Sequence, residues 1–476
     1  MCIQVLKNLL VAKFGGSAIG IDGKLIPIII KRINELKKDA KVIAVFSAPL
    51  TLHDGKQRSL TDIAIMIGQK AQEGQDIGIE NLRKPYQKML EFVDKKYHDE
   101  CKKTIDSFLE KAAKSIKQAL QKKEFADVIR SSTLAYSGEI LMSYVMNYIL
   151  KSNNIKSDVV GFDIWPVITD KNIESANFLA SESTQNMEQI ESLLEKNDVL
   201  SIGGFIGKTA DGLETTYERG GSDRTAADLG ILFSKKYNTK IDFEKDSAVL
   251  SADPRIVKDE LEDITHLSYN EARTAGMFGM KILDPIVIKE IVENGIDMPI
   301  IITDMNNPAK ITTIERMPTT KDGHPLKIVT GKRNCAILRI ESVAAQSLFD
   351  SLEKEKRYSE FVVLSPYIKD DIEFTRILFL DADYVKRNER YILAFDSLAT
   401  ITYNRGVITL IGDEMWRVQQ IASKASSKVG EAGLNILNMD AQEETSRIII
   451  VIEDTADNIE RAIRAVHAER SKITFV

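Results

Sequence analysis

Two glycine-rich segments contain residue types that suit a phosphate-bearing ligand. The first, KFGGS at residues 13–17, follows the apolar run LLVA, and the second, RGGSD at residues 219–223, opens an apolar helical pattern. Only glycine lets backbone N–H groups approach a phosphate without a Cβ clash. A fixed lysine can neutralise the charge that spreads over the phosphoryl oxygens during transfer. Together the segments predict a phosphoryl-transfer site, whereas either one alone is also typical of an ordinary tight turn.

The composition excludes several classes of function. The chain has 476 residues, 43% of them hydrophobic and 28% charged, with a net charge of -6. This length predicts more than one domain, and an acidic chain is a poor match for nucleic acid. The lysines between residues 84 and 123 are interleaved with acidic and apolar residues at helical spacing, which predicts a solvated helix face.

Cysteine, histidine and hydropathy patterns bear on the compartment and on metals. The three cysteines and five histidines are scattered, so we expect neither a disulfide framework nor a metal site held by these residues. No apolar run approaches the ~20 residues that span a bilayer. The sequence therefore predicts a cytoplasmic protein without membrane or nucleic-acid partners.

The first 310 residues or so alternate short apolar runs with helical patterns. Strands are expected at residues 9–12, 41–46, 159–162, 199–202 and 298–302. Such alternation favours an α/β sandwich with a mainly parallel sheet. Ligands of these sheets bind at the carboxyl ends of the strands, which is where both glycine-rich segments are expected to lie.

From about residue 327 the pattern changes, and it then repeats. Strands are expected at 335–340, 360–364, 374–380 and 398–403, and again at 407–411, 434–439, 448–452 and 472–476. Helices are expected at 343–352, 416–432 and 458–467, with a short one after residue 380. The order is βαββαβ twice at an offset of about 70 residues, which is the split-βαβ ferredoxin-like unit.

Six motifs in chain order add a more specific signal. They are KFGGS at 13–17, FSA at 46–48, SGE at 137–139, GFIG with TT and RGGSD between 204 and 223, SADPR at 251–255, and LSYNEA with FGMKIL between 267 and 283. In these motifs the chain resembles aspartokinases of the amino-acid-kinase superfamily that carry two C-terminal ACT domains. The resemblance implies a three-layer catalytic sandwich at 1–315 and ACT-like domains at 327–404 and 405–476.

The resemblance also implies a reaction and its site. ATP with Mg²⁺ would phosphorylate the β-carboxylate of L-aspartate to 4-phospho-L-aspartate, the first step toward lysine, threonine and methionine. Lys13 and Asp223 would be catalytic. The implied aspartate-binding residues are Ser47, Thr61, Glu139, Arg219 and Ser222, and the implied nucleotide-binding residues are Gly15, Gly16, Ser17, Gly220, Gly221, Arg255 and Lys281. Magnesium would arrive with the nucleotide, not in a protein-held cage.

Several of these residues also have a structural explanation. Arg219 suits a substrate carboxylate through two parallel hydrogen bonds, but also a surface ion pair. Glu139 suits a substrate ammonium, but also the first turn of a helix. Asp223 could cap the helix that follows it, and Thr61 lies within residues 59–62, whose pattern S-x-x-D is a variant of the capping box.

Some positions depart from the aspartokinase pattern. Lys245 and Leu250 replace the aspartate and tyrosine of T-T-D-V-x-G-V-Y, near the expected nucleotide site. Residues 339–342 and 439–444 lack the glycine loop and the Q-G-S-S-E segment of effector-binding ACT domains, so an amino-acid effector stays open. ACT pairing through sheet edges implies a homodimer or a dimer of dimers. A catalytically silent amino-acid or nucleotide sensor, or a kinase for another small amino acid, are the alternatives.

Overall fold

The computed structural model describes residues 6–218, 221–317, 324–354, 360–442 and 445–473. It divides into two compact units, the first formed by residues 1–248 and 286–316 and the second by residues 249–285 and 317–476. Residues 249–285 thus belong to the second unit, although segments of the first precede and follow them in the sequence. Arg219 and Gly220, which are expected site residues, lie outside the described residues.

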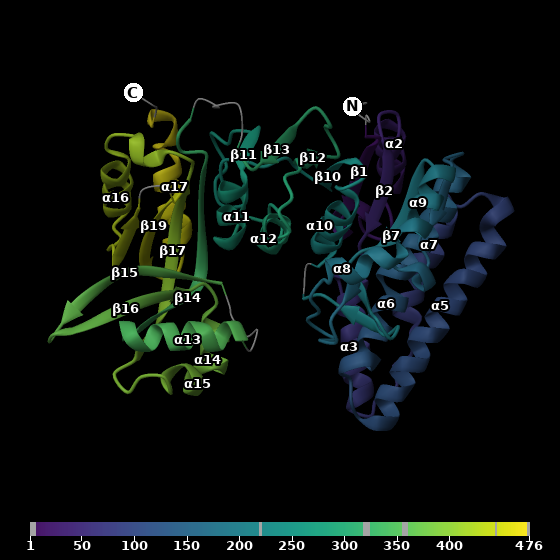
Figure 1. The fold of residues 1–476 in the computed structure, drawn as a ribbon, viewed down its shortest axis with the longest axis horizontal. Coiled ribbons are helices and arrows are strands. Elements are labelled where there is room, and N and C mark those ends of the chain that lie inside the picture. Colours follow the sequence, from purple (N-terminus) through teal and green to yellow (C-terminus); the bar gives the residue numbers. More distant parts are fainter. Residues whose placement is uncertain (1–5, 219–220, 318–323, 355–359, 443–444, 474–476) are drawn as a thin grey trace. The chain divides into compact units, whose positions relative to one another are not determined.

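A mainly parallel sheet forms the centre of the first unit (Figure 1). In spatial order the strands that the first unit contributes to it are β13 (Ile311–Glu315), β12 (Ile300–Asp304), β10 (Asn238–Lys245), β1 (Asn8–Phe14), β2 (Lys41–Phe46), β7 (Val199–Gly203) and β5 (Ser157–Val159). All neighbours from β12 to β5 are parallel, and β13 is antiparallel to β12. The strand expected at 159–162 is displaced, because β5 ends at Val159 and a 3-10 helix occupies Phe162–Ile164.

Helices cover both faces of this sheet. Arg32 of α2 (Ile26–Leu36) bonds Glu244, whereas Asp223 of α10 (Ser222–Phe233) pairs with Lys13. Phe14 and Glu244 are partners in the strand register, so Lys13 and Glu244 point to opposite faces. The expected three-layer α/β arrangement is confirmed.

The remaining elements of the first unit are short strands and further helices. The helices are α1 (Gly16–Ile19), α3 (Leu60–Gln72), α4 (Glu80–Met89), α5 (Lys95–Lys122), α6 (Asp127–Ser137), α7 (Glu139–Ser152), α8 (Ala180–Ser183), α9 (Met187–Lys196) and α12 (Pro285–Glu293). The strands are β3 (Leu50–His53), β4 (Lys56–Ser59), β6 (Ile168–Thr169), β8 (Ile206–Thr209) and β9 (Glu214–Thr216).

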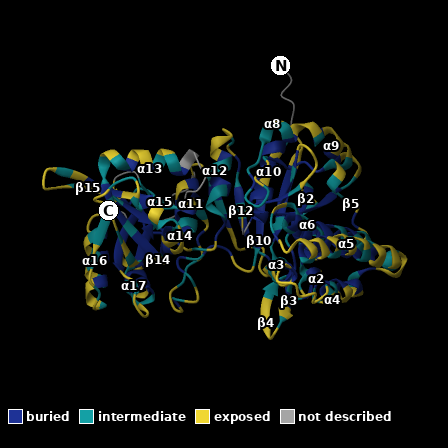
Figure 2. Ribbon diagram, turned by 90° about the horizontal axis from the view of Figure 1, so that it is seen from below, coloured by how far each residue is buried: buried dark blue, intermediate teal, exposed yellow. Residues whose placement is uncertain are grey.

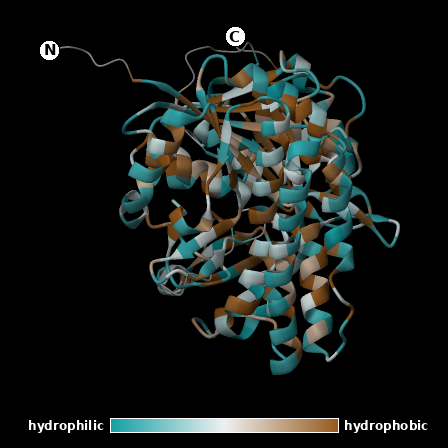
Figure 3. Ribbon diagram, turned by 90° about the vertical axis from the view of Figure 1, so that its right-hand side faces the viewer, coloured by the Kyte–Doolittle hydropathy of each residue, from teal (hydrophilic) through white to brown (hydrophobic). Residues whose placement is uncertain are grey.

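The lysine-rich stretch is mainly helix α5. Asp94 caps its start by accepting a hydrogen bond of 3.0 Å from Lys96 N–H, and Lys123 ends it in a left-handed conformation. One face of α5 is buried through Cys101, Ile105, Leu109, Ala112, Ile116 and Ala119. Its lysines lie on the exposed face, and Figure 3 shows the resulting mixture of hydrophilic and hydrophobic positions along the helices on this side. The predicted solvated helix face is confirmed.

An antiparallel sheet forms the centre of the second unit. Its strands, in spatial order, are β15 (Phe361–Lys369), β16 (Ile372–Phe379), β14 (Ile328–Glu341), β17 (Thr400–Ile411), β19 (Arg447–Glu453) and β18 (Asn438–Ala441). Its helices are α11 (Tyr269–Met277), α13 (Ser342–Lys354), α14 (Ala382–Arg387), α15 (Glu389–Leu393), α16 (Ile421–Glu431) and α17 (Asn458–His467), and the short strand β11 (His266–Ser268) precedes α11.

The two ferredoxin-like repeats are present, and one is inserted into the other. Residues 328–332 of β14 pair with 407–411 of β17, whereas 335–339 pair with 400–405. The first repeat therefore interrupts the second, whose initial strand is 328–332. The two strands expected at 398–403 and 407–411 instead form one continuous strand, β17, whose two halves pair with the two halves of β14. The strand expected at 472–476 is wrong in its described part, because Arg470–Lys472 is a 3-10 helix.

Each repeat has its own apolar core, visible as buried strands in Figure 2. One core lies between the sheet and α13, α14 and α15, and includes Leu338, Leu348, Ile377, Phe379 and Val385. The other lies between the sheet and α16 and α17, and includes Ile408, Val429, Ile450, Ile463 and Ile473. Ile473, which follows the 3-10 helix, is thus part of this core.

Candidate active site

Lys13 and Asp223 are in contact at the carboxyl edge of the parallel sheet. Lys13 lies one residue before the end of β1, and Asp223 lies in the first turn of α10. Lys13 Nζ is 2.7 Å from Asp223 Oδ1, and the two side chains are only 13% and 11% exposed. A charge-assisted contact of this length holds the ammonium group in one place. Residues from the two glycine-rich segments are thereby brought together, as the sequence predicts.

Two glycines at the end of β7 let the starts of two helices approach the sheet. A Cβ atom on Gly203 would lie 2.7 Å from the carbonyl carbon of Glu139, at the start of α7. A Cβ atom on Gly204 would lie 2.6 Å from the Cβ of Ser222, at the start of α10. Real Cβ contacts are not that short, so glycine is required at both positions for steric reasons. Glu139 and Ser222 therefore lie beside consecutive residues of the same strand end.

The KFGGS turn is also limited by space. Gly15 has an extended conformation and precedes α1, so its φ of -72° does not require glycine. A Cβ atom there would instead lie 3.1 Å from Lys13 Nζ, and one on Gly16 would lie 3.0 Å from the carbonyl oxygen of Ala48. Ser17 is exposed. The turn leaves room around the lysine ammonium that a side chain would take.

Glu139 is a buried carboxylate with one oxygen open. Its side chain accepts a hydrogen bond of 3.3 Å from Thr61 Oγ1 and others from its own N–H and that of Ala48. Its Oε2 atom is buried and has no hydrogen-bond partner among the described residues. Burial raises the pKa of the carboxyl from 4.5 to about 7 against these hydrogen bonds. A buried acceptor without a partner is costly, so this geometry suits a ligand that donates to Oε2.

Both explanations of Thr61 apply at once. Ser59 caps α3 by accepting a hydrogen bond of 3.0 Å from Asp62 N–H, as the S-x-x-D pattern predicts. The Thr61 hydroxyl is left to bond Glu139. Ser47 follows β2, and its N–H donates to Phe14 O at 3.1 Å, which places it at the same sheet edge as Lys13.

The sequence did not predict a buried network of polar side chains on α10, the helix that carries Asp223. Tyr217 donates a hydrogen bond of 2.5 Å to Asp228 on α10, and Arg224 of the same helix pairs with Glu290 at 2.6 Å. Burial, together with the charge of Glu290, raises the pKa of Asp228 well above its usual range. The available signal was a pair of charged residues inside the apolar stretch RTAADLGILF, which predicts buried, paired charges.

The other expected nucleotide contacts are distributed over both units. Gly221, which precedes α10, cannot carry a side chain, because its Cβ atom would lie 2.3 Å from the Cβ of Tyr217. Arg255 and Lys281 belong to the second unit. Arg255 is exposed and pairs with Asp253 at 2.5 Å, and Lys281 is exposed.

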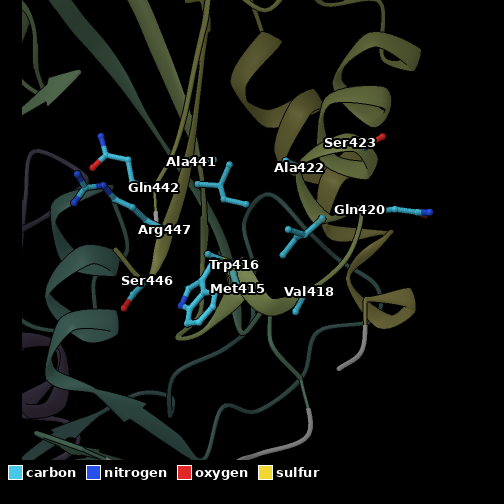
Figure 4. A pocket seen from close by; sticks show the side chains of 12 residues that line it. Met415, Trp416, Val418, Gln420, Ala422, Ser423, Ala441, Gln442, Ser446 and Arg447 are labelled. Atoms are coloured by element: carbon cyan, nitrogen blue, oxygen red, sulfur yellow. The ribbon is translucent and has the colours of Figure 1, made fainter. Parts of the chain in front are cut away.

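The second unit contains a separate cavity of about 390 Å³ (Figure 4). It lies between the start of α16, the segment that follows β17, and the hairpin of β18 and β19. Its walls are mainly apolar, with Met415, Val418, Ile421 and Ile448 among them. Arg447 is directed away from Val418 in the close view. None of the predicted site residues lines this cavity.

Within the described ranges, no group of three or more His, Cys, Asp and Glu side chains is arranged to hold a metal ion. None of the helices in the described part of the chain combines the length and apolar character needed to cross a membrane.

Comparison with known proteins places the chain in a family. The amino acid kinase family matches residues 8–304. The chain belongs to this family. Aspartokinase of Rickettsia felis is 25% identical over 331 residues, which cover 68% of the chain and 79% of the relative. The bifunctional aspartokinase/homoserine dehydrogenase of Buchnera aphidicola is 24% identical, and the match covers 78% of the chain but only 46% of that longer protein.

Solved structures confirm the fold of this amino acid kinase. Aspartokinase III of E. coli in complex with aspartate and ADP has a TM-score of 0.77 at 17% identity, covering 97% of the chain and 99% of the solved chain. Aspartate kinase of Clostridium acetobutylicum has a TM-score of 0.68 at 20% identity, covering 97% and 100%. The resemblance to aspartokinases that the motifs indicate is therefore confirmed.

Proposed function

We propose that the protein is an ATP-dependent aspartate kinase that makes 4-phospho-L-aspartate. The observation that carries this proposal is the arrangement at the edge of the parallel sheet in the first unit. A fixed lysine ammonium at the end of β1 and a buried carboxylate with an open oxygen beside the end of β7 lie at the same edge of the sheet. The lysine suits a phosphoryl group, and the carboxylate suits an ammonium group of the acceptor.

The acceptor is recognised through its charges in this proposal. Glu139 Oε2 receives a hydrogen bond from the α-ammonium of L-aspartate, which supplies the partner that the buried oxygen lacks. An acylated amino acid carries no such cation and would leave the carboxylate unpaired, which disfavours it by several kcal/mol in a dry site. Thr61 fixes the other oxygen of Glu139. Ser47, Ser222 and Arg219 remain the proposed contacts for the rest of the substrate.

Phosphoryl transfer then needs positioning and charge neutralisation. An oxygen of the aspartate β-carboxylate attacks the γ-phosphorus of ATP, the bond to the β,γ-bridging oxygen breaks, and ADP leaves with its electron pair. Lys13 neutralises charge on the transferring group, and Asp223 holds Lys13 in place through their 2.7 Å contact. Magnesium comes with the nucleotide phosphates, where it supplies further neutralisation. Gly15, Gly16, Ser17, Gly220 and Gly221 are the proposed phosphate contacts of the first unit, and Arg255 and Lys281 those of the second.

Complexes of a solved neighbour support the proposed substrates and an amino-acid effector. E. coli aspartokinase III has been solved with aspartate and ADP, and also with lysine and aspartate. We propose residues 1–315 as the catalytic domain and 327–404 and 405–476 as ACT-like domains, the first inserted into the second as described above. We also propose pairing of these domains through sheet edges into a homodimer or a dimer of dimers.

The decisive experiment traps the proposed product. Purified protein is incubated with Mg-ATP, L-aspartate and hydroxylamine, which converts an acyl phosphate to a hydroxamate that is detected as its coloured iron(III) complex. We expect a signal that depends on both ATP and L-aspartate, and no signal with N-acetyl-L-aspartate. ATP binding without hydroxamate would instead favour a sensor, and a signal only with another small amino acid would change the acceptor.

A further inference from the structure

Strand β10 brings a second lysine to the edge of the sheet where Lys13 ends. Lys245 is the last residue of β10, and Phe14 of β1 is in register with Glu244, the residue before it. The Lys245 side chain therefore projects from the strand end next to the KFGGS turn. Its backbone is fixed as well, because Met305 N–H donates a hydrogen bond of 2.9 Å to Lys245 O.

Alternation along β10 decides which face this lysine occupies. Glu244 points to the α2 face, where Arg32 Nε bonds it at 2.6 Å. Lys245 points to the opposite face, together with Phe243, whose ring lies 5.9 Å from the Lys245 ammonium. Lys13 is in register with Phe243, so it shares that face, and α10 carries Asp223 there. Neighbouring residues of β10 therefore place the paired carboxylate of Glu244 on one face of the sheet and the ammonium of Lys245 on the other.

We propose that Lys245 is a third charged group of the phosphoryl-transfer site and binds terminal phosphate oxygens of ATP together with Lys13. The proposal rests on the proposed function and deepens it. Lys245 and Lys13 lie on one face at the carboxyl end of the sheet, where a polyphosphate would lie, and Asp223 acts on both. A polyphosphate offers anionic oxygens to both ammonium groups, whereas a neutral nucleoside does not.

The surroundings give this lysine a pH dependence. The groups that act on it are Lys13 on β1, Asp223 on α10 and Asp246 in the next turn, and Asp304 on β12 is its register partner. Burial, with the charge of Lys13, lowers the pKa of Lys245 against the effect of Asp223. ATP affinity and turnover should therefore fall on the alkaline side as Lys245 loses its proton.

The test compares three variants of β10. Lys245→Gln removes the charge, Lys245→Arg keeps it at all accessible pH values, and Lys240→Gln removes the charge of an exposed lysine on the same strand as a matched control. We expect Lys245→Gln to weaken Mg-ATP binding, measured by calorimetry, at least ~10-fold and to lower kcat/KM for ATP about 10²-fold. Adenosine affinity and KM for aspartate should not change. Lys245→Arg should recover most of the loss and move the alkaline decline to higher pH.

The outcomes separate the two proposals. Weaker ATP binding in Lys245→Gln, in a protein that makes no hydroxamate from aspartate, would keep the phosphate contact and remove the kinase assignment. Equal ATP affinity in Lys245→Gln and wild type would overturn the contact, as would equal losses in the Gln and Arg variants or a wild type that binds no ATP. If Lys245→Gln fails to fold, the alkaline decline of wild type against Lys245→Arg decides the question alone.

Discussion

Glu139 in the first unit and Glu271 in the second differ only in how their oxygens are bonded. Each is buried and lies in the first turn of a helix, and burial raises the pKa of each carboxyl. Glu271 accepts hydrogen bonds from Lys327 Nζ at 2.9 Å, Ser268 N–H at 2.8 Å and Asp413 N–H at 2.7 Å. Glu139 leaves Oε2 without a partner among the residues that the structure describes. Burial alone therefore does not identify a binding residue, and the open oxygen of Glu139 is informative because it lies at the carboxyl edge of the sheet that also carries Lys13.

The comparison also separates stability from function. The Glu271 bonds connect α11 with the segments after β17 and before β14, so they hold the second unit together. The Glu139 carboxylate makes fewer stabilising bonds of this kind, and its burial raises its pKa. Replacing Glu271 should therefore lower stability, whereas replacing Glu139 should weaken substrate binding.

The largest effect is expected at Glu271. Glu271→Ala leaves the Lys327 ammonium, which is only 11% exposed, without its anion and Asp413 N–H without an acceptor. We expect a loss of about 3–5 kcal/mol in the free energy of unfolding of the second unit, and a smaller loss for Glu271→Gln. The chain has two tryptophans, Trp165 in the first unit and Trp416 in the second. Urea unfolding followed by Trp416 fluorescence in a Trp165→Phe background reports the second unit alone.

The next effect is expected at the Lys13–Asp223 contact. Lys13→Ala and Asp223→Ala should each lower turnover by about 10²–10³-fold, because each removes or releases the cation that meets the transferring phosphoryl group. Hydroxamate formation measures this, and the double variant should lose little more than either single one, since the two residues act as a unit. Near-normal turnover in both single variants would remove these residues from the catalytic step.

Local motifs predicted much of this structure, but long-range pairing limited what could be derived. The sequence predicted the parallel sheet, the position of the two glycine-rich segments at the carboxyl ends of its strands, and the βαββαβ repeats. It did not predict that residues 328–332 complete the second repeat, because their partner strand lies about 75 residues further along. The burial of Asp228 and the open oxygen of Glu139 also depend on which elements pack around them, and neighbouring residues do not carry that information.

The smallest effect is expected at Glu139, where the direction of the change in stability tests the comparison with Glu271. Glu139→Gln should raise KM for aspartate at least ~10-fold and leave KM for ATP unchanged, because the amide lacks the charge that pairs with the substrate ammonium. Unlike Glu271→Gln, it should not destabilise the protein. The folded state holds the Glu139 proton up to about pH 7 whereas the unfolded state releases it near 4.5, so wild-type stability falls as pH rises between these values.

Above pH 7 the loss of wild-type stability that ionised Glu139 causes reaches up to about 3 kcal/mol. Glu139→Gln should remove this loss. At that pH the variant should therefore unfold at a higher urea concentration than wild type. Aspartate binding should reverse the shift, because the substrate ammonium favours the ionised carboxylate. Titration of aspartate near pH 6.5 in buffers of different ionisation enthalpy should therefore release a fraction of a proton from wild type and none from Glu139→Gln. Equal proton release in both would mean that another group receives the ammonium, and the open oxygen of Glu139 would then no longer distinguish it from Glu271.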